Sequence, residues 1–183
     1  MTTAIVIGDG PAGLSAALFL AKNGVETTVL GQDNTAMHYA ELHNYLGIPV
    51  IGGTEFQQIA RSQVVDKGAT LLHAEANTIQ ADGAGFRVET TDGGRHTADY
   101  IVIAEGKAAS LAKALGLAMN GDGVAVDRDF RTGIDGLYVV GRATRTGRSQ
   151  AIISAGQGAT AAIDILSRIK GADVRDFDEP ANE

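Results

Sequence analysis

Apolar positions at the start of the chain form a short unbroken run and then recur at helical spacing. The run 4–7 (AIVI) leads into the glycine-rich segment 8–13, and small and apolar residues then repeat with the period of a helix. This order predicts a buried strand, a tight turn and a helix. We expect the helix to end near Asn23-Gly24, with the glycine as its cap. The segment Val25–Leu30 is predicted to be a second strand.

Periodicity is lost between Asn34 and Gly53, where aromatic, histidine and apolar residues are interspersed. A loop of this length in a compact domain is usually functional or disordered, and its apolar content favours packing over a ligand. The tetrapeptide 54–57 (TEFQ) has the sequence of a capping box, which predicts a helix that begins there and runs to about Asp66. Gly68 would end this helix.

The middle of the chain alternates in the manner of strands. We predict a strand at 70–73, then three short strands separated by Asp82-Gly83 and Asp92-Gly93-Gly94. Glycine-containing turns between such strands favour an antiparallel meander, with strands at 76–80, 85–90 and 96–98. The fully apolar run Tyr100–Ala104 predicts another buried strand.

The last third returns to strand and helix patterns. We predict a short helix at 110–115, a turn at Asn120-Gly121, strands at 124–126 and 136–141, and a final helix at 150–169. The segment 171–183 is acidic and has little apolar content, so we expect a disordered tail.

Alternating strands and helices predict an α/β fold of the Rossmann type, with a parallel sheet covered by helices and the meander as an appended crossover. The chain of 183 residues shows no internal repeat and no linker. We therefore expect one domain over residues 1–170, followed by the tail.

Composition narrows the possible functions. The net charge of -7 argues against nucleic acid or an anionic membrane as the main partner. The absence of cysteine removes disulfides, thiolate metal sites and redox dithiols. No spacing of His, Asp and Glu suggests a metal site. Because no signal sequence or span-length apolar run precedes or interrupts the strands, we expect a cytoplasmic protein.

The segment 8–13 (GDGPAG) fits the dinucleotide-binding fingerprint. In that fingerprint Gly8 allows the sharp turn, Gly10 lets a pyrophosphate approach the backbone, and Gly13 lets helix and strand pack closely. The N-terminus of the helix then faces the anion. The alternative is an ordinary strand-to-helix turn, and the flanking elements favour the dinucleotide interpretation.

One part of the fingerprint is missing. An acid is expected at the end of the second strand, where it would hydrogen-bond the adenosine ribose, and this position carries Gly31. Gln32 or Asp33 would have to substitute for it. Asp33 has an alternative role as a solvated loop acid.

Together these pieces resemble the FAD-binding domain of the low-molecular-weight thioredoxin reductase family, within the flavoproteins that have two dinucleotide-binding domains. The resemblance covers about residues 3–168 and rests on four segments: GDGPAG at 8–13, NYLGIP at 44–49, IAEG at 103–106, and Gly136–Gly141 followed by SQAIISAGQG at 149–158. It implies FAD as the cofactor. It also implies these site residues: Gly8, Gly10, Pro11, Ala12 and Gly13 at the pyrophosphate, Asn44 near the flavin ring, Gly106 in the segment similar to the family's ATG box, Gly141 near the ribityl chain, and Gln150 and Ala151 at the pyrimidine edge of the flavin.

The chain departs from this family in three ways. The family inserts an NADPH-binding domain between its ATG box and the last strand, whereas here about thirty residues connect Gly106 to Gly136. Because the chain has no cysteine, it cannot be a thioredoxin reductase or any other dithiol oxidase. Thirdly, Arg142 replaces the family's aspartate, and an arginine accepts no hydrogen bond but can hold a phosphate with two donors.

Other residues near these motifs have two interpretations each. Arg142, Arg145 and Arg148 form either an anion site or a solvated basic face. His38 and His43 are either proton donors to a reduced flavin or ordinary loop histidines. Tyr39 and Tyr45 either stack on the ring or anchor the loop to the core.

The sequence thus predicts a single-domain FAD-binding protein, most simply an oxidoreductase that takes electrons at an exposed flavin from NAD(P)H, another small reductant or a partner protein. The alternative is a non-catalytic FAD-binding module, a flavin carrier or sensor. A plain NAD-binding domain is disfavoured because it leaves Gly141 and the segment 150–158 without a role. Loss of the inserted domain would expose apolar surface, so we expect a homodimer.

Overall fold

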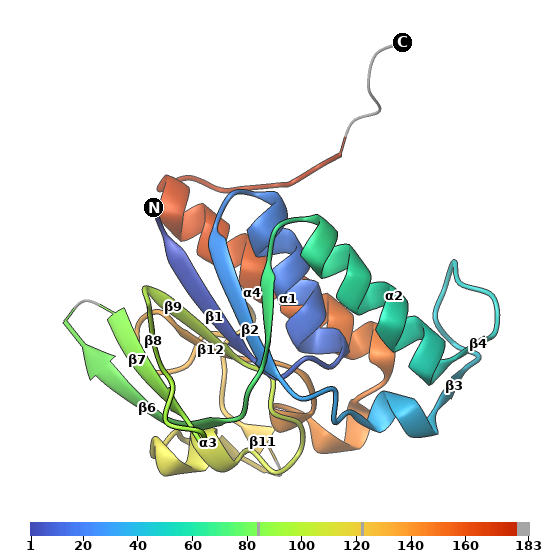
Figure 1. Ribbon diagram of the computed structural model, residues 1–183, viewed down its shortest axis with the longest axis horizontal. Coiled ribbons are helices and arrows are strands. Elements are labelled where there is room, and N and C mark those ends of the chain that lie inside the picture. The colour runs from blue at the N-terminus through green and yellow to red at the C-terminus, as the bar shows by residue number, and fades with distance from the viewer. Residues whose placement is uncertain (84, 122, 179–183) are drawn as a thin grey trace.

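The computed structural model describes residues 1–83, 85–121 and 123–178 (Figure 1). Its centre is a five-stranded parallel sheet in the order β12-β9-β1-β2-β5. The strands are β1 (Thr3–Ile7), β2 (Glu26–Gly31), β5 (Thr70–His73), β9 (Tyr100–Ile103) and β12 (Leu137–Val139). The expected α/β fold with a parallel sheet is confirmed, and β1 lies in the middle of it.

Alternation along the central strands gives the sheet two buried faces. Ala4 and Val6 of β1 face one hydrophobic cluster, which includes residues of α1 (Pro11–Lys22) and α4 (Ala151–Lys170). Ile5 and Ile7 face the other cluster. Because successive strand residues point to opposite faces, an unbroken apolar run is what a strand covered on both sides requires.

The first face is covered by helices. Figure 1 shows α1 and α4 side by side against the sheet, with α2 (Gly53–Asp66) next to α1. The two helices α1 and α4 approach closely because Gly158 has no side chain. A Cβ at Gly158 would meet the backbone of Ala12 and would lie 3.0 Å from the Ala16 nitrogen.

The second face is covered by the predicted meander and a short helix. The meander is an antiparallel sheet of β6 (Ala76–Asp82), β7 (Gly85–Thr90) and β8 (Arg95–Ala98), and α3 (Ser110–Ala114) follows β9. Ile79, Phe86 and Val88 carry its contacts with the central sheet. The three-stranded meander is therefore also confirmed.

Short elements complete the chain. Two hairpins are formed by β3 (Glu41–Leu42) with β4 (Ile51–Gly52), and by β10 (Met119–Asn120) with β11 (Gly123–Val124). Single 3₁₀ turns occur at η1 (Ala36–Tyr39), η2 (Gly141–Ala143) and η3 (Thr146–Arg148). None of the described helices is long and apolar enough to cross a lipid bilayer.

The predicted capping box at 54–57 is wrong. The helix α2 begins one residue earlier, its N-cap is Gly52, and no side chain caps it. The Gly53 N–H donates instead to the Ala40 carbonyl at 2.8 Å, and the Thr54 hydroxyl lies 3.1 Å from Nδ1 of His38. A Cβ at Gly53 would be only 2.9 Å from that same carbonyl oxygen, so a tertiary contact, rather than local capping, sets the start of the helix.

The described part of the tail, 171–178, follows α4 and contacts the helices. Val174 packs against the helical core, and its N–H donates to the Ser167 hydroxyl at 3.0 Å. Asp176 accepts hydrogen bonds from Lys22 and Asn23 of the α1 terminus. Positions 179–183 lie outside the described residues, and the expected disorder of the tail 171–183 stays a prediction.

A buried carboxylate fixes α4 to the sheet. The Asp164 side chain is 10% exposed and pairs with Arg131 through two hydrogen bonds. The Tyr138 hydroxyl donates to the same carboxylate at 2.6 Å. Burial raises the pKa of Asp164, but the hydrogen bonds from Arg131 and Tyr138 outweigh it and hold the pKa below its usual value.

We predict that Asp164→Ala lowers the free energy of unfolding by about 1–3 kcal/mol, because it leaves the buried Tyr138 hydroxyl without an acceptor. Denaturant titration at pH 7 measures this loss. Since the folded-state pKa is depressed, the difference from wild type should shrink as the pH falls below about 4, where the carboxyl becomes protonated in both states.

The matched control is Tyr138→Phe, which removes the orphaned hydroxyl. Asp164→Ala combined with Tyr138→Phe should cost less than the sum of the two single variants. Strict additivity would show that Asp164 is not an acceptor that the buried hydroxyl needs.

Candidate functional site

Two adjoining cavities lie at the carboxyl ends of the central strands. The first has a volume of about 400 Å³ and lies between the end of β1, the N-terminus of α4 and the loop that contains η1. The second has a volume of about 520 Å³ and lies beside the end of β2 and the start of α3. Gly8, Asp9, Asn34 and Glu105 line both cavities. Ligands of doubly wound α/β folds bind at this edge of the sheet.

The glycine-rich loop after β1 forms the floor between the cavities. Gly8 has a φ of +101°, which glycine adopts without strain. A Cβ at Gly13 would collide with the carbonyl of Gly8, so Gly13 is needed for the close approach of α1 to β1. A Cβ at Gly10 would touch only the Thr35 hydroxyl, at 3.4 Å, which leaves the space above Gly10 open.

Two helix N-termini point into the first cavity without a capping side chain. At the start of α1, Gly10, Pro11 and Ala12 line the cavity, and the first turn holds no acidic residue. At the start of α4, the cavity is lined by Gln150 and Ala151, again without a side-chain cap. Free N–H groups and two helix dipoles therefore favour negative charge at this site.

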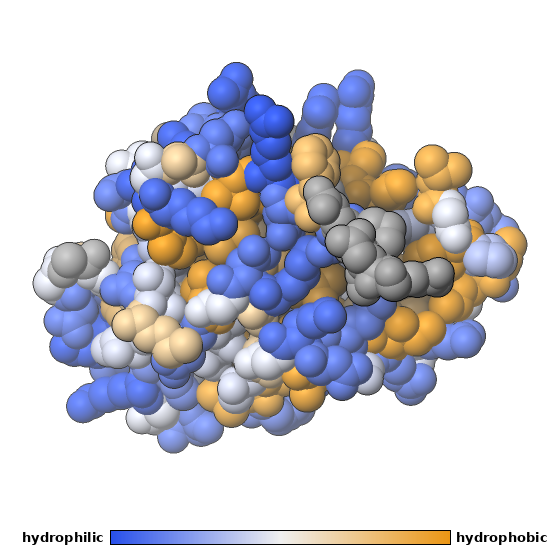
Figure 2. Space-filling model, turned by 90° about the horizontal axis from the view of Figure 1, so that it is seen from above, coloured by the Kyte–Doolittle hydropathy of each residue, from blue (hydrophilic) through white to orange (hydrophobic). Residues whose placement is uncertain are grey.

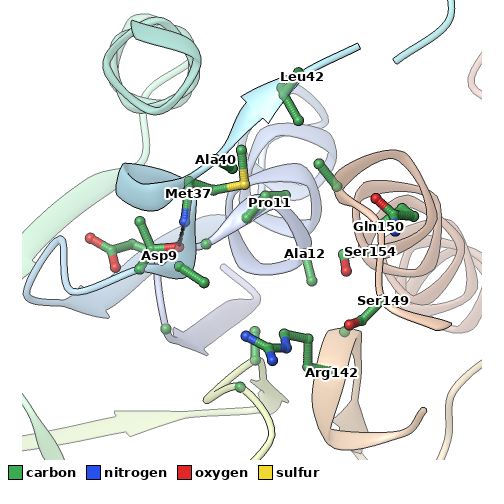
Figure 3. A pocket seen from close by; sticks show the side chains of 18 of the residues that line it. Asp9, Pro11, Ala12, Met37, Ala40, Leu42, Arg142, Ser149, Gln150 and Ser154 are labelled. Atoms are coloured by element: carbon green, nitrogen blue, oxygen red, sulfur yellow. Dashed lines mark hydrogen bonds between the residues drawn. The ribbon is translucent and has the colours of Figure 1, made fainter. Parts of the chain in front are cut away.

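Arg142 adds a full positive charge. Its side chain extends from η2 into the cavity, below Pro11 and Ala12 in Figure 3. Among the described residues, no carboxylate lies within ion-pair distance of it, and its Nε is buried without a hydrogen-bond partner. A guanidinium without a described carboxylate partner is suited to holding an anion, although Asp9, Glu41 and Glu105 line the same cavity.

Gly141 connects the turn that carries Arg142 to the helices α1 and α4. It has a φ of +73°, and its N–H donates to Oε1 of Gln157 on α4 at 2.6 Å. A Cβ at Gly141 would lie 3.0 Å from the Cβ of Ala12. The turn that carries Arg142 is thus held against both α1 and α4.

The outer part of the first cavity is partly apolar. Met37 and Leu42 of the η1 loop form a small hydrophobic cluster with Ala151, and Figure 3 shows Met37 and Leu42 on the side of the cavity opposite Arg142. At its mouth the Asn44 side chain donates to that of Gln150 at 3.1 Å. An apolar wall with a polar edge suits a flat ring that carries hydrogen-bonding groups.

Most of the predicted site residues meet in this place. The first cavity is lined by Gly8, Gly10, Pro11, Ala12, Asn44, Gly106, Gly141, Arg142, Gln150 and Ala151. Gly13 lies beneath the loop and packs on Gly8. Gln32 is exposed and lines the second cavity.

The histidines and tyrosines of the loop line neither cavity. His38 bonds to Thr54 and to the Asp33 carbonyl, and His43 bonds to Glu41 on the surface. Tyr39 is 93% exposed. Tyr45 packs on Phe56 with the ring centroids 5.4 Å apart, which makes it a core anchor.

The other two arginines of the basic stretch, Arg145 and Arg148, are exposed and lie outside both cavities. They belong to a solvated basic face, so the basic stretch contributes Arg142 alone to the site.

Sequence reasoning assigned no role to several residues that line the cavities. Glu105 caps α3 by accepting from the N–H groups of Leu111 and Ala112 at 2.9 and 3.1 Å. Asp9 could have been noticed in the sequence, because an acid inside a phosphate-binding loop is unexpected: its charge repels that of the ligand. Met37 and Leu42 had only the general expectation that the loop covers a ligand.

Comparison with known proteins agrees with this geometry. The profile of the family "pyridine nucleotide-disulphide oxidoreductase" matches residues 51–162, and that of the family "FAD binding domain" matches residues 1–41. Thioredoxin reductase from Aquifex aeolicus is 31% identical over 106 residues, which are 56% of this chain and 33% of that protein.

Two further matches extend over more of the chain. Thioredoxin reductase from Streptomyces coelicolor is 32% identical over 130 residues, which are 66% of this chain and 39% of that protein. The structure of a thioredoxin reductase from Gloeobacter violaceus has a TM-score of 0.86 at 17% identity, with 98% of this chain and 100% of that chain covered. The chain therefore spans less than half the length of these two curated relatives.

The chain thus has an α/β fold of the thioredoxin reductase type. The chain belongs to the pyridine nucleotide-disulphide oxidoreductase family. The resemblance stated from the sequence motifs is confirmed, and it holds in a chain without cysteine.

Proposed function

We propose that this protein binds FAD across the two cavities and acts as an oxidoreductase through an exposed flavin. The observation that carries the proposal is the convergence on one cavity of two uncapped helix N-termini and of Arg142, which has no carboxylate partner among the described residues. Such a site attracts a diphosphate, and its apolar wall beside Met37 and Leu42 suits the flavin ring.

The residues present fit the cofactor in both halves. The open space over Gly10 would hold the pyrophosphate, with Arg142 as a second donor. The Gln150 end of α4 would face the ring, and the second cavity beside Gly31 and Gln32 would hold the adenosine. When bound, FAD would supply the electron-transfer chemistry, and the protein would supply binding, orientation and positive potential.

The source of electrons follows from what the described chain contains. Between β9 and β12 the described residues form only α3 and one hairpin, with no second dinucleotide fold. We therefore propose that a pyridine nucleotide, another small donor or a partner protein brings electrons to the ring from outside the described residues. The titratable side chains that line the first cavity are Asp9, Glu41, Glu105 and Arg142, and the described histidines are not among them.

The second candidate function is a non-catalytic FAD-binding module, a flavin carrier or sensor. The absence of cysteine favours it, because the dithiol chemistry in the name of the family needs two thiols. A measurement of catalytic turnover distinguishes the oxidoreductase from the non-catalytic module.

We predict that the purified protein is yellow, releases FAD rather than FMN on denaturation, and reduces an artificial acceptor with NADPH or NADH. Absorbance spectra, chromatography of the released flavin and steady-state assays measure these properties. A yellow protein without turnover would support the non-catalytic module. A colourless protein that also fails to bind added FAD would contradict both candidates.

The matched variants are Gly10→Val and Gly133→Val. Neither glycine has a positive φ, and a Cβ at Gly133 meets nothing within 4 Å, so both variants should fold. Gly10→Val should lose FAD because its side chain fills the place of the pyrophosphate, whereas Gly133→Val should keep it. Equal flavin content in the two variants would place the cofactor elsewhere.

A second prediction concerns Arg142. Arg142→Ala should raise the FAD dissociation constant about tenfold or more, because a charge-assisted contact contributes about 1.5–3 kcal/mol. Arg148→Ala is the matched control, since Arg148 is exposed outside the cavity. An unchanged constant in Arg142→Ala would assign this arginine to a docking surface, and salt-dependent reduction rates would then reveal it.

The third prediction concerns oligomeric state. Apolar side chains gather where Figure 2 is orange at the right-hand end, the end that holds α2 and β3–β4 in Figure 1. The exposed apolar residues there include Leu46, Val50 and Ile59, at 91%, 59% and 47% exposure. We expect a homodimer through this surface, with Leu46→Lys monomeric and Met119→Lys, a change in β10, still dimeric. Light scattering at micromolar concentration tests this, and a monomeric wild-type protein would contradict it.

A further inference from the structure

The end of β2 has an unusual neighbour. Where the dinucleotide fingerprint expects a ribose-binding acid, the chain has Gly31, and the Asp9 side chain lies against it. A Cβ at Gly31 would collide with the Asp9 carboxyl group and would lie 2.6 Å from its Cβ. No residue other than glycine therefore fits at position 31 while Asp9 has this orientation. The Asp9 carboxyl group thus fills the space that the side chain of an acid at position 31 would need.

Only one of the two Asp9 carboxylate oxygens accepts hydrogen bonds from the described residues. Its side chain is 5% exposed, and Oδ2 accepts from Arg61 and from the Asp33 N–H at 3.0 Å. Among the described residues, none donates to Oδ1. Asp9 lines both cavities, so the residue lies where the two halves of a dinucleotide would join.

One face of α2 holds Asp9 in this position. Gln57 and Arg61 are four residues apart, so they lie on the same side of the helix. The fully buried Gln57 donates its Nε2 to the Asp9 carbonyl at 2.5 Å, and Arg61 pairs with the carboxylate. The guanidinium offsets a negative charge that would otherwise repel the pyrophosphate of the ligand.

The alternatives at the end of β2 are less suited to this role. Asp33 has a φ of +56°, and its carboxylate lies 3.2 Å from Nε2 of His38. Gln32 is exposed and carries no charge. Asp9, by contrast, is a buried acid whose carboxyl group lies against the position that the fingerprint reserves for one.

We propose that Asp9 hydrogen-bonds the adenosine ribose of the bound dinucleotide, in place of the acid absent from position 31, and that Gln57 and Arg61 are its positioning residues. This inference rests on the proposed function, because it assigns a residue to the adenosine half of that ligand. It also explains why an acid is present in a loop built for phosphate.

The test is a rescue experiment with FAD and FMN as the two probes, followed by flavin fluorescence. Asp9→Ala should weaken FAD about tenfold or more and leave FMN unchanged within about threefold, because FMN has no adenosine ribose. Asp9→Ala combined with Gly31→Glu clears the collision and returns the acid to the end of β2. This double variant should recover FAD affinity to within about fivefold of wild type, whereas Gly31→Glu alone should not bind FAD normally.

Each other result has a defined meaning. Equal weakening of FAD and FMN in Asp9→Ala, without rescue, would make Asp9 a structural residue of the loop and overturn the proposal. If Asp9→Ala does not fold by circular dichroism, Asp9→Leu keeps about the same side-chain size without a hydrogen-bonding group, and unchanged FAD binding there would also overturn it. FAD binding by the wild-type protein together with unchanged FAD affinity in Asp9→Ala would refute this inference alone. A wild-type protein that binds FMN but not FAD would refute the proposed function. A wild-type protein that binds neither would refute the proposed function.

Discussion

The close approach of α1 to its neighbours is the constraint on which the site depends. Gly13 lets α1 start directly over β1, and Gly158 lets α4 cross α1 with its backbone near Ala12 and Ala16. Side chains at either glycine would push the helices apart. The helices cross in their N-terminal halves, and residues at the N-termini of both line the same cavity. The close packing of the helices therefore brings two helix N-termini, with their partial positive charges, to one cavity.

Charge is distributed in agreement with this geometry. The chain is acidic as a whole, and half-buried arginines elsewhere in it are paired, as Arg131 is with Asp164 and Arg61 is with Asp9. Arg142 lines the cavity without a described carboxylate partner. The pairing of Asp9 with Arg61 keeps an acid of the loop from cancelling that local positive charge. Glu41 and Glu105 also line this cavity, so the proposed attraction of an anion depends on the two helix N-termini and Arg142 rather than on the net charge of the lining.

The sequence predicted the parts of the fold that local patterns determine. The apolar run at 4–7, the glycines of the loop and the turns at 82–83 and 92–94 specify strand, helix and hairpin without help from distant residues. The family motifs added the correct gathering of Asn44, Gly106 and Gln150 around one cavity. Their contacts with a cofactor stay predictions.

Sequence-based predictions failed where contacts between residues far apart in the sequence determine the structure. Thr54 has the right sequence for a cap, but the approach of Gly53 to the η1 carbonyls moves the start of α2. Asp9 and Gly31 are 22 positions apart in sequence, and only the register of β1 beside β2 shows that they compete for one space.

The most direct test of this account is a crystal structure of the protein grown with FAD. We expect the pyrophosphate over Gly10 at the N-terminus of α1, within hydrogen-bond distance of the Arg142 guanidinium, with the flavin ring between Met37 and the start of α4. FAD bound away from this cavity, or an ordered Arg142 turned away from the pyrophosphate to solvent, would contradict it.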